Sequence, residues 1–360
     1  MKKKLSLGRL WTDYSYIFVL VLIIIAYAFV LTNNGVRFNW NHIVGIFSSQ
    51  TTCIVGTMAL GMALIVITGN IDLSLGSGLV LCTGVAIMVF NTTGSPALMF
   101  ISAIASGALC GLINGVLIGL AKMQAFIATL GTMLIYRSIA LYIARSIPQT
   151  ISGSGSGQFA MMNTQPKYQG LRQGFGAGRL TIGGTDIIPW ITVLFLVLAF
   201  ITIFITKKTK FGKTIYSIGS NAAASRLVGI NVTGVKIAVY VITGILVGFA
   251  SFIQACKVGN VSPATSGQSY EMYAVASIVL GGISMAGGKG NLVGIIFGAM
   301  SYTTINFIIA SIPGLSVDIQ NAFQGMVLIV VILVQTLGPI FKEKIDTAKK
   351  RKASAALDDK

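Results

Sequence analysis

Long apolar stretches separated by short polar segments run through almost the whole chain. A helix needs about 20 mostly apolar residues to cross a bilayer. Ten stretches fit this requirement: 14–31, 43–69, 73–90, 97–120, 124–145, 188–206, 235–256, 271–286, 291–311 and 318–338. The sequence lacks the strict alternation of membrane β-strands, and a helix satisfies its own backbone hydrogen bonds in lipid. The pattern therefore predicts an all-α polytopic membrane protein with about ten transmembrane helices.

The polar segments divide the chain into a short N-terminal segment (1–13), one transmembrane domain (14–338) and a basic tail (339–360). Two connections inside the domain are longer than turns, at about 146–187 and about 207–235. The first contains a Ser-Gly repeat at 152–157. Such a loop is either a flexible connection or a docking surface.

Composition supports the membrane class. The mean hydropathy is +0.83 and charged residues make up 10% of the chain, whereas soluble domains have about 25%. A soluble protein of this length needs more polar surface to cover its core. These values exclude a single soluble domain, a disordered chain and a small disulfide-rich secreted domain.

The net charge of +17, from 26 Lys and Arg against 9 Asp and Glu, would suggest nucleic-acid binding in a soluble protein. In membrane proteins, however, basic residues collect on the cytoplasmic side. With a cytoplasmic N-terminus, 19 basic residues fall inside, five fall outside, and Arg137 and Arg145 lie in a span. We therefore expect a multi-pass cell-membrane protein with both termini in the cytoplasm, a lipid bilayer as its surroundings and no nucleic acid. A basic tail binding nucleic acid or acidic lipid is the less simple interpretation.

The sequence carries no recognisable catalytic or cofactor motif. The Gly-rich run 281–290 resembles a phosphate loop, but it lacks the G-x-x-x-x-G-K-[ST] spacing and joins two predicted spans. The four Cys stand in apolar runs without metal-ligand spacing, and His42 is the only His. We therefore expect a transport protein rather than an enzyme, with no catalytic residue, metal or cofactor in this chain.

Polar residues at span edges are the candidates for a pathway and for gating. The stretch 43–69 is longer than a span needs and contains Ser48, Ser49, Gln50 and Thr51 in succession. Transporters often break helices where the backbone lines a cavity, so this run either lines the outer part of a polar pathway or begins the helix loosely at the interface.

Three further residues at span edges are candidates for structural or gating roles: Asp72, Ser74 and Glu271. Asp72 could alternatively cap the helix that follows it. Arg137 is the one charge well inside a span, and it either reaches the interface or pairs with Asp72 or Glu271.

Glycine repeats of four residues predict close helix packing. Gly107, Gly111, Gly115 and Gly119 repeat along one span, and Gly290, Gly294 and Gly298 along another. This spacing places each set on one helix face, where the missing side chains let neighbouring backbones approach.

The connection at about 207–235 predicts a short cytoplasmic helix. Gly219 is expected to break the chain, Ser220 or Asn221 to cap, and the following alanines to propagate a helix that ends at Gly229. A short capped helix on this face fits the groove of a partner, although it could equally be an ordinary amphipathic surface turn.

The runs Thr209–Lys213 and Gly219–Ile230 resemble the cytoplasmic loop of the ribose, galactose, xylose and autoinducer-2 class of ABC-importer permeases. Further matching runs occur in the family's order: Ile71–Ser74, Leu112–Gly115, Phe126–Thr132, Tyr270–Glu271 and Val279–Ser284. The resemblance covers about residues 14–338. Two departures stand out, because Asn70 replaces the usual glycine before Ile71 and Ala125 replaces the usual proline before Phe126.

The resemblance implies a permease of about ten spans that pairs with a second permease subunit. Two cytoplasmic ATPase subunits would bind ATP and Mg²⁺, and an external solute-binding protein would deliver a sugar. The coupling helix would include these residues: Gly219, Asn221, Ala223, Arg226 and Gly229. The matching runs also carry Asn114, Phe126 and Thr129, which we expect to line the pathway. The external loop becomes a docking candidate, with Arg172 and Arg179 facing acidic residues.

We therefore predict the transmembrane permease subunit of an ATP-driven ABC importer for a monosaccharide or similar small polar solute. The alternative is a secondary transporter or channel. Ion-coupled carriers usually keep acidic groups in the middle of a span, and the sequence places none there.

Overall fold

The computed structural model describes residues 7–314, except 156, 183 and 184, together with scattered positions between 319 and 333. The helices are α1 (Leu7–Asn33), α2 (Trp40–Ser48), α3 (Gln50–Ile67), α4 (Leu75–Thr93), α5 (Pro96–Gly119), α6 (Ala125–Ser146), α7 (Gln149–Ser152), the π-helix η1 (Gly170–Gly176), α8 (Trp190–Lys208), α9 (Lys210–Ser220), α10 (Ala222–Leu227), α11 (Val232–Val258), α12 (Tyr270–Leu280) and α13 (Val293–Ala310). The strands are β1 (Phe159–Ala160), β2 (Arg179–Ile182), β3 (Thr185–Pro189) and β4 (Asn260–Val261).

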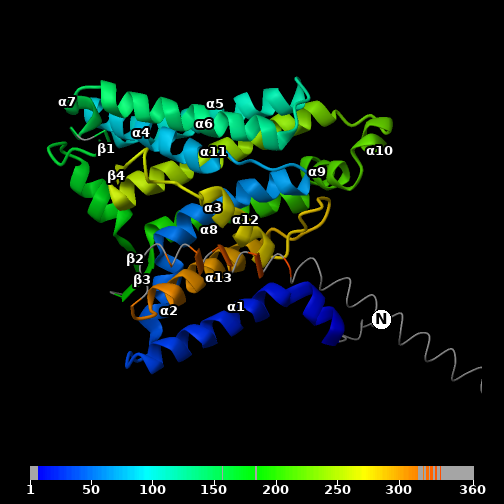
Figure 1. Ribbon diagram of the computed structural model, residues 1–360, viewed down its shortest axis with the longest axis horizontal. Coiled ribbons are helices and arrows are strands. Elements are labelled where there is room, and N and C mark those ends of the chain that lie inside the picture. The colour runs from blue at the N-terminus through cyan, green and yellow to red at the C-terminus, as the bar shows by residue number, and fades with distance from the viewer. Residues whose placement is uncertain are drawn as a thin grey trace, which may run out of the picture.

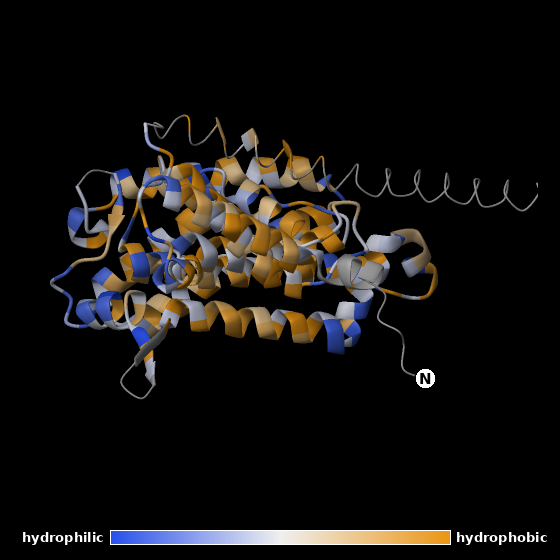
Figure 2. Ribbon diagram, turned by 90° about the horizontal axis from the view of Figure 1, so that it is seen from below, coloured by the Kyte–Doolittle hydropathy of each residue, from blue (hydrophilic) through white to orange (hydrophobic). Residues whose placement is uncertain are grey.

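The all-α membrane class is confirmed. In the part of the chain that the structure describes, eight helices are long and apolar enough to cross a membrane: α1 from Ser15, α3, α4, α5, α6, α8, α11 and α13. Figure 2 shows apolar residues along these helices and polar residues gathered toward their ends. The predicted span 318–338 lies mostly, and the tail 339–360 wholly, outside the described residues.

Two predicted spans are wrong in detail. The stretch 43–69 is two helices, because Ser49 takes an extended conformation (φ −60°, ψ 137°) between α2 and α3. The stretch 271–286 contains α12, which has only 11 residues and is therefore about 16 Å long, roughly half the hydrocarbon thickness. Gly281 follows the last residue of α12, and Gly282 has a φ of +80° that favours glycine, so the helix does not continue.

The helices lie along the long axis of the molecule, and its two ends differ (Figure 1). α9, α10 and the beginning of α1 lie at one end, whereas α7, β1 and β4 lie at the other. The segment 146–187 is therefore at the opposite end from the segment 207–235. This arrangement agrees with the opposite sides predicted for the two segments.

The predicted glycine packing between helices is present between α5 and α11. A Cβ added at Gly107 would collide with the carbonyl oxygen of Gly244, and one at Gly111 with the carbonyl oxygen of Tyr240. The second repeat is confirmed for Gly294 and Gly298, which meet Gly281, directly after α12, and Ser277 on α12. Gly290, however, lies in the loop before α13 and not on the helix, with a φ of +141°.

The long external segment is folded against the bundle. β1 pairs with β4, and β2 with β3, both antiparallel. The buried side chain of Asn91 on α4 donates to the carbonyls of Ile151 and Ala160, each at 2.9 Å, and accepts from Met162 N at 2.9 Å. One amide therefore ties three points of the segment to a spanning helix, which argues against a merely flexible connection.

Candidate functional site

A short helix projects at the end of the bundle where the resemblance places the coupling helix. Asn221 begins α10 by accepting a hydrogen bond from Ala224 N at 2.9 Å, as the capping prediction required. Gly229 follows the helix with a φ of +82°, a conformation that favours glycine. Ala223 and Arg226 are exposed, and Leu227 and Val228 are 89% and 76% exposed.

Gly219 does not break the chain, contrary to the sequence prediction. It lies inside α9, and the break falls at Asn221 (φ −160°, ψ 102°). A Cβ at position 219 would collide with the carbonyl oxygen of Ile67. The glycine is therefore needed for close approach between α9 and the end of α3 rather than for a turn.

α9 lies against the end of α3 and against the loop that follows α12. We call the connection between α3 and α4 linker A (68–74) and the connection between α12 and α13 linker B (281–292). Tyr216 on α9 donates to the carbonyl oxygen of Gly290 in linker B at 2.8 Å. Gly288 N, also in linker B, donates to Ile67 O at 2.9 Å, immediately before linker A. Burial raises the pKa of the Tyr216 hydroxyl, so this donor stays protonated at neutral pH.

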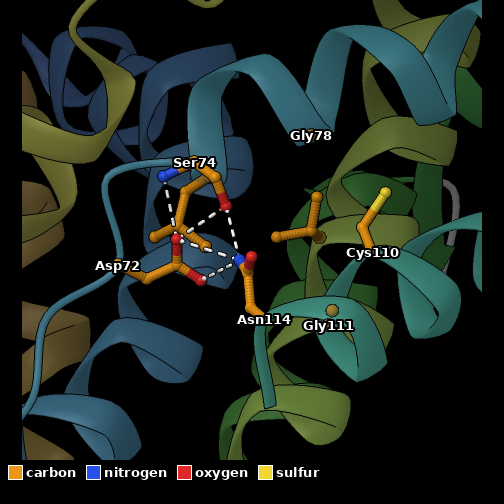
Figure 3. Close-up of a pocket in the computed structure, with 9 residues that line it drawn as sticks. Asp72, Ser74, Gly78, Cys110, Gly111 and Asn114 are labelled. Atoms are coloured by element: carbon orange, nitrogen blue, oxygen red, sulfur yellow. Dashed lines mark hydrogen bonds between the residues drawn. The ribbon is translucent and has the colours of Figure 1, made fainter. Parts of the chain in front are cut away.

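Linker A carries a buried polar cluster that joins three predicted site residues, Asp72, Ser74 and Asn114 (Figure 3). Asp72 Oδ1 accepts from Ser74 N at 2.8 Å and from Ser74 Oγ at 2.7 Å. Asn114 Nδ2 on α5 donates to Asp72 Oδ2 at 3.3 Å and to Ser74 Oγ at 2.8 Å. Linker A is thereby attached to α5.

This cluster forms one wall of a small pocket whose other walls come from α4, α5 and α11. Asn114 Oδ1 is buried and has no hydrogen-bond partner among the described residues. In Figure 3 the Asn114 oxygen points away from Asp72. On the α11 side, Tyr240 donates to Ile71 O at 3.0 Å, so linker A is held from two helices.

The predicted polar run lies at the break between α2 and α3. Ser49 Oγ accepts from Thr51 N at 3.1 Å, and Ser48 Oγ donates to Gly45 O at 3.4 Å. Gln50 donates to the Gln254 side chain on α11 at 3.0 Å. All four residues of the run are half-buried. A broken helix with partly exposed polar groups is the arrangement that the pathway hypothesis requires.

The remaining predicted pathway residues lie elsewhere. Phe126 is 56% exposed on α6, and the buried Thr129 donates to Ala125 O within the same helix. α6 packs on α4 and α5, whereas α2 packs on α3, α8 and α13. The structure therefore does not bring Phe126 and Thr129 to the α2–α3 break.

Glu271 lies in the first turn of α12, and its side chain reaches the start of α4, because a Cβ at Gly76 would lie 2.7 Å from its Oε2. Arg137 on α6 makes its hydrogen bonds to backbone carbonyls, and Glu271 is close enough to interact with its charge. Its Nη1 donates to the backbone carbonyls of Pro263 at 2.7 Å and Ser266 at 2.9 Å, in the segment that leads into α12. Sequence reasoning missed this role, because carbonyl partners in a loop leave no residue-type pattern.

The described residues contain no group of three or more His, Cys, Asp or Glu that could hold a metal ion.

Comparisons with known proteins place the chain among transport permeases. Residues 46–332 match the model of the family described as branched-chain amino acid transport system / permease component. The chain is similar to the ribose import permease protein RbsC of Escherichia coli (strain K12), with 33% identity over 311 residues, which cover 86% of this chain and 89% of the relative. No solved structure matches.

Two more relatives show how far the similarity extends. RbsC of Bacillus subtilis (strain 168) is 34% identical over 286 residues, covering 79% of this chain and 82% of the relative. The xylose transport system permease protein XylH of Haemophilus influenzae is 29% identical over 332 residues, covering 81% and 88%. The similarity therefore spans the transmembrane domain and is not confined to one motif.

Proposed function

The chain belongs to the branched-chain amino acid transport system / permease component family, and from this premise we propose that it is the transmembrane subunit of an ATP-driven importer for a monosaccharide. It is a multi-pass membrane protein and a transport component rather than an enzyme. The printed names of the similar relatives, which are import permeases for ribose and xylose, support a sugar as the solute.

The observation that supports an ATP-driven mechanism is the exposed surface of α10. It projects at one end of the bundle, and the large apolar side chains of Leu227 and Val228 at its end are exposed. Exposed apolar side chains rimmed by polar groups are typical of a protein interface. A cytoplasmic ATPase subunit is the partner that the family supplies, and ATP with Mg²⁺ would bind to that subunit.

The mechanism follows from the contacts of α9. ATP binding in the partner shifts α10, and α9 passes the movement to linker B through Tyr216 and to the end of α3, where linker A begins, through Gly219. The spanning helices attached to these linkers then exchange outward for inward access. A second permease subunit completes the pathway, and both termini lie in the cytoplasm.

An external solute-binding protein docks on the folded segment 146–187. Arg179 is exposed there, and Arg172 is half-buried, with its Nη1 donating to Cys256 O at 3.2 Å. Arg179 is therefore free to meet an acidic surface, whereas Arg172 also holds the segment to α11.

Co-purification with the cognate ATPase tests the proposal. Leu227→Asp and Arg226→Glu should reduce the recovered ATPase and abolish sugar uptake, because both side chains are exposed on α10. Arg179→Glu, a charge reversal at the other end of the molecule, is the control and should leave ATPase recovery unchanged. Normal ATPase recovery and uptake in both α10 variants would contradict the coupling role. Uptake without any ATPase would favour the secondary transporter instead.

A further inference from the structure

The pocket beside Asn114 lies where α5 and α11 already touch backbone to backbone. A Cβ added at Gly111 would collide with the carbonyl oxygen of Tyr240, and one at Gly244 with the carbonyl oxygen of Gly107. Gly111 and Gly244 both line the pocket. Because these two helices have no room to approach further, they do not close the space between them and the start of α4.

On the α4 side, the space exists because residue 78 is a glycine. Gly78 lines the pocket, and among the described residues outside α4 a Cβ added there would meet only Val247 Cγ1, at 3.8 Å. This is an ordinary van der Waals distance, so a methyl group would fit. The pocket has a volume of about 10 Å³, which is about the least that one water molecule needs. It therefore excludes a sugar or any other organic solute.

Polar side chains take part in the walls of this pocket, namely those of Asp72, Ser74, Cys110 and Asn114. Asn114 is 1% exposed, and its Oδ1 has no hydrogen-bond partner among the described residues. Its Nδ2 donates to Asp72 and Ser74, on the opposite side of the amide from Oδ1 (Figure 3). An overturned amide would lose these two bonds and exchange the places of Oδ1 and Nδ2. A buried polar atom without a protein partner therefore lies at the pocket in either orientation, which is costly unless a ligand satisfies it.

We propose that this pocket binds one water molecule, which donates a hydrogen bond to Asn114 Oδ1. A buried water typically makes about three hydrogen bonds, and Asp72, Ser74 and Cys110 provide the polar groups for the others. The water completes the cluster that attaches linker A to α5. Because the site concerns how linker A is held, the inference does not depend on which solute the permease transports.

The substitution Gly78→Ala tests this site, because a dry pocket and a hydrated pocket predict opposite results. In a dry pocket the methyl group fills empty space and replaces a glycine inside a helix, so the thermal midpoint of the purified full-length permease should rise. In a hydrated pocket the methyl group displaces the water and leaves Asn114 Oδ1 without a donor. We expect this second result, a midpoint lower by about 2 °C. Gly131→Ala on α6, where a Cβ meets nothing within 4 Å, is the matched control and should not lower the midpoint.

A second background separates the loss of water from steric strain. Leu has the branched shape of Asn without its polar atoms, so Asn114→Leu removes the acceptor. In that background Gly78→Ala should no longer lower the midpoint. The inference is overturned if Gly78→Ala does not lower the midpoint of the otherwise unmodified permease, or lowers it equally in both backgrounds.

A density map of the unmodified permease, at a resolution that shows other buried waters, checks the site directly and needs no variant to fold. We expect a peak within hydrogen-bond distance of Asn114 Oδ1. A map that shows buried waters elsewhere and none at this position would also overturn the inference.

Discussion

At the scale of single residues, the side-chain amide of Asn114 connects linker A to α5. Asn114 lies 1% exposed and donates to both Asp72 and Ser74. These residues are about 40 positions apart in the chain. The sequence marks each of them as a polar residue at a span edge or in a matching run, but no local pattern indicates that they meet. The contact arises from the packing of α4 and α5, which a linear pattern does not contain.

Removing this amide should destabilise the protein. Asn114→Leu leaves the Asp72 carboxyl buried without its partner from α5, which costs about 1–3 kcal/mol. The expected result is a lower thermal midpoint of the purified protein in detergent. Asn163→Leu, at an exposed position in the external segment, is the control. Equal midpoints for the two variants would contradict the role of the cluster.

At the scale of helices, hydrophobic periodicity predicts where the chain is in the membrane better than how each helix ends. It identifies α4, α5, α6, α8 and α13 to within a few residues. It fails for 43–69 and 271–286, because an apolar run does not show whether its backbone stays helical. The polar run beginning at Ser48 and the glycines from Gly281 were the only signs of those interruptions.

The α5–α11 contact is the element that should tolerate substitution least. Gly111→Ala places a Cβ against the carbonyl oxygen of Tyr240, so the two helices must separate. We expect less protein in the membrane and a lower thermal midpoint, measured by fluorescence-detected size exclusion and thermal unfolding. Gly131→Ala on α6 is the matched control, because a Cβ there meets nothing within 4 Å. Equal behaviour of the two variants would show that close approach is not needed.

At the scale of the whole molecule, the two ends carry different chemistry. One end presents α10 with exposed Leu227 and Val228, and the other presents the folded segment tied down by Asn91. The distribution of basic residues predicts which end faces the cytoplasm. The helix order alone does not, because an inverted molecule would have the same internal contacts.

Labelling from the two sides of the membrane tests this orientation. The four native cysteines among the described residues are buried, so their background reaction should be low. Ala223→Cys should react with a membrane-impermeant maleimide only in inside-out vesicles. Gly170→Cys, exposed in the external segment, should react in intact cells. The reverse pattern would invert the topology.

The shared contacts of α9 limit how the two linkers can move. Gly219 sits against the end of α3, where linker A begins, Tyr216 donates to linker B, and Gly288 in linker B bonds to Ile67, so α9, the end of α3 and linker B close a ring of contacts. In a closed ring, no member is displaced without moving or detaching the others. The permease therefore has few intermediate arrangements in which one linker has shifted and the other has not. Under the proposed mechanism, a solute therefore meets one concerted exchange of access rather than two independent gates that could open together and leak.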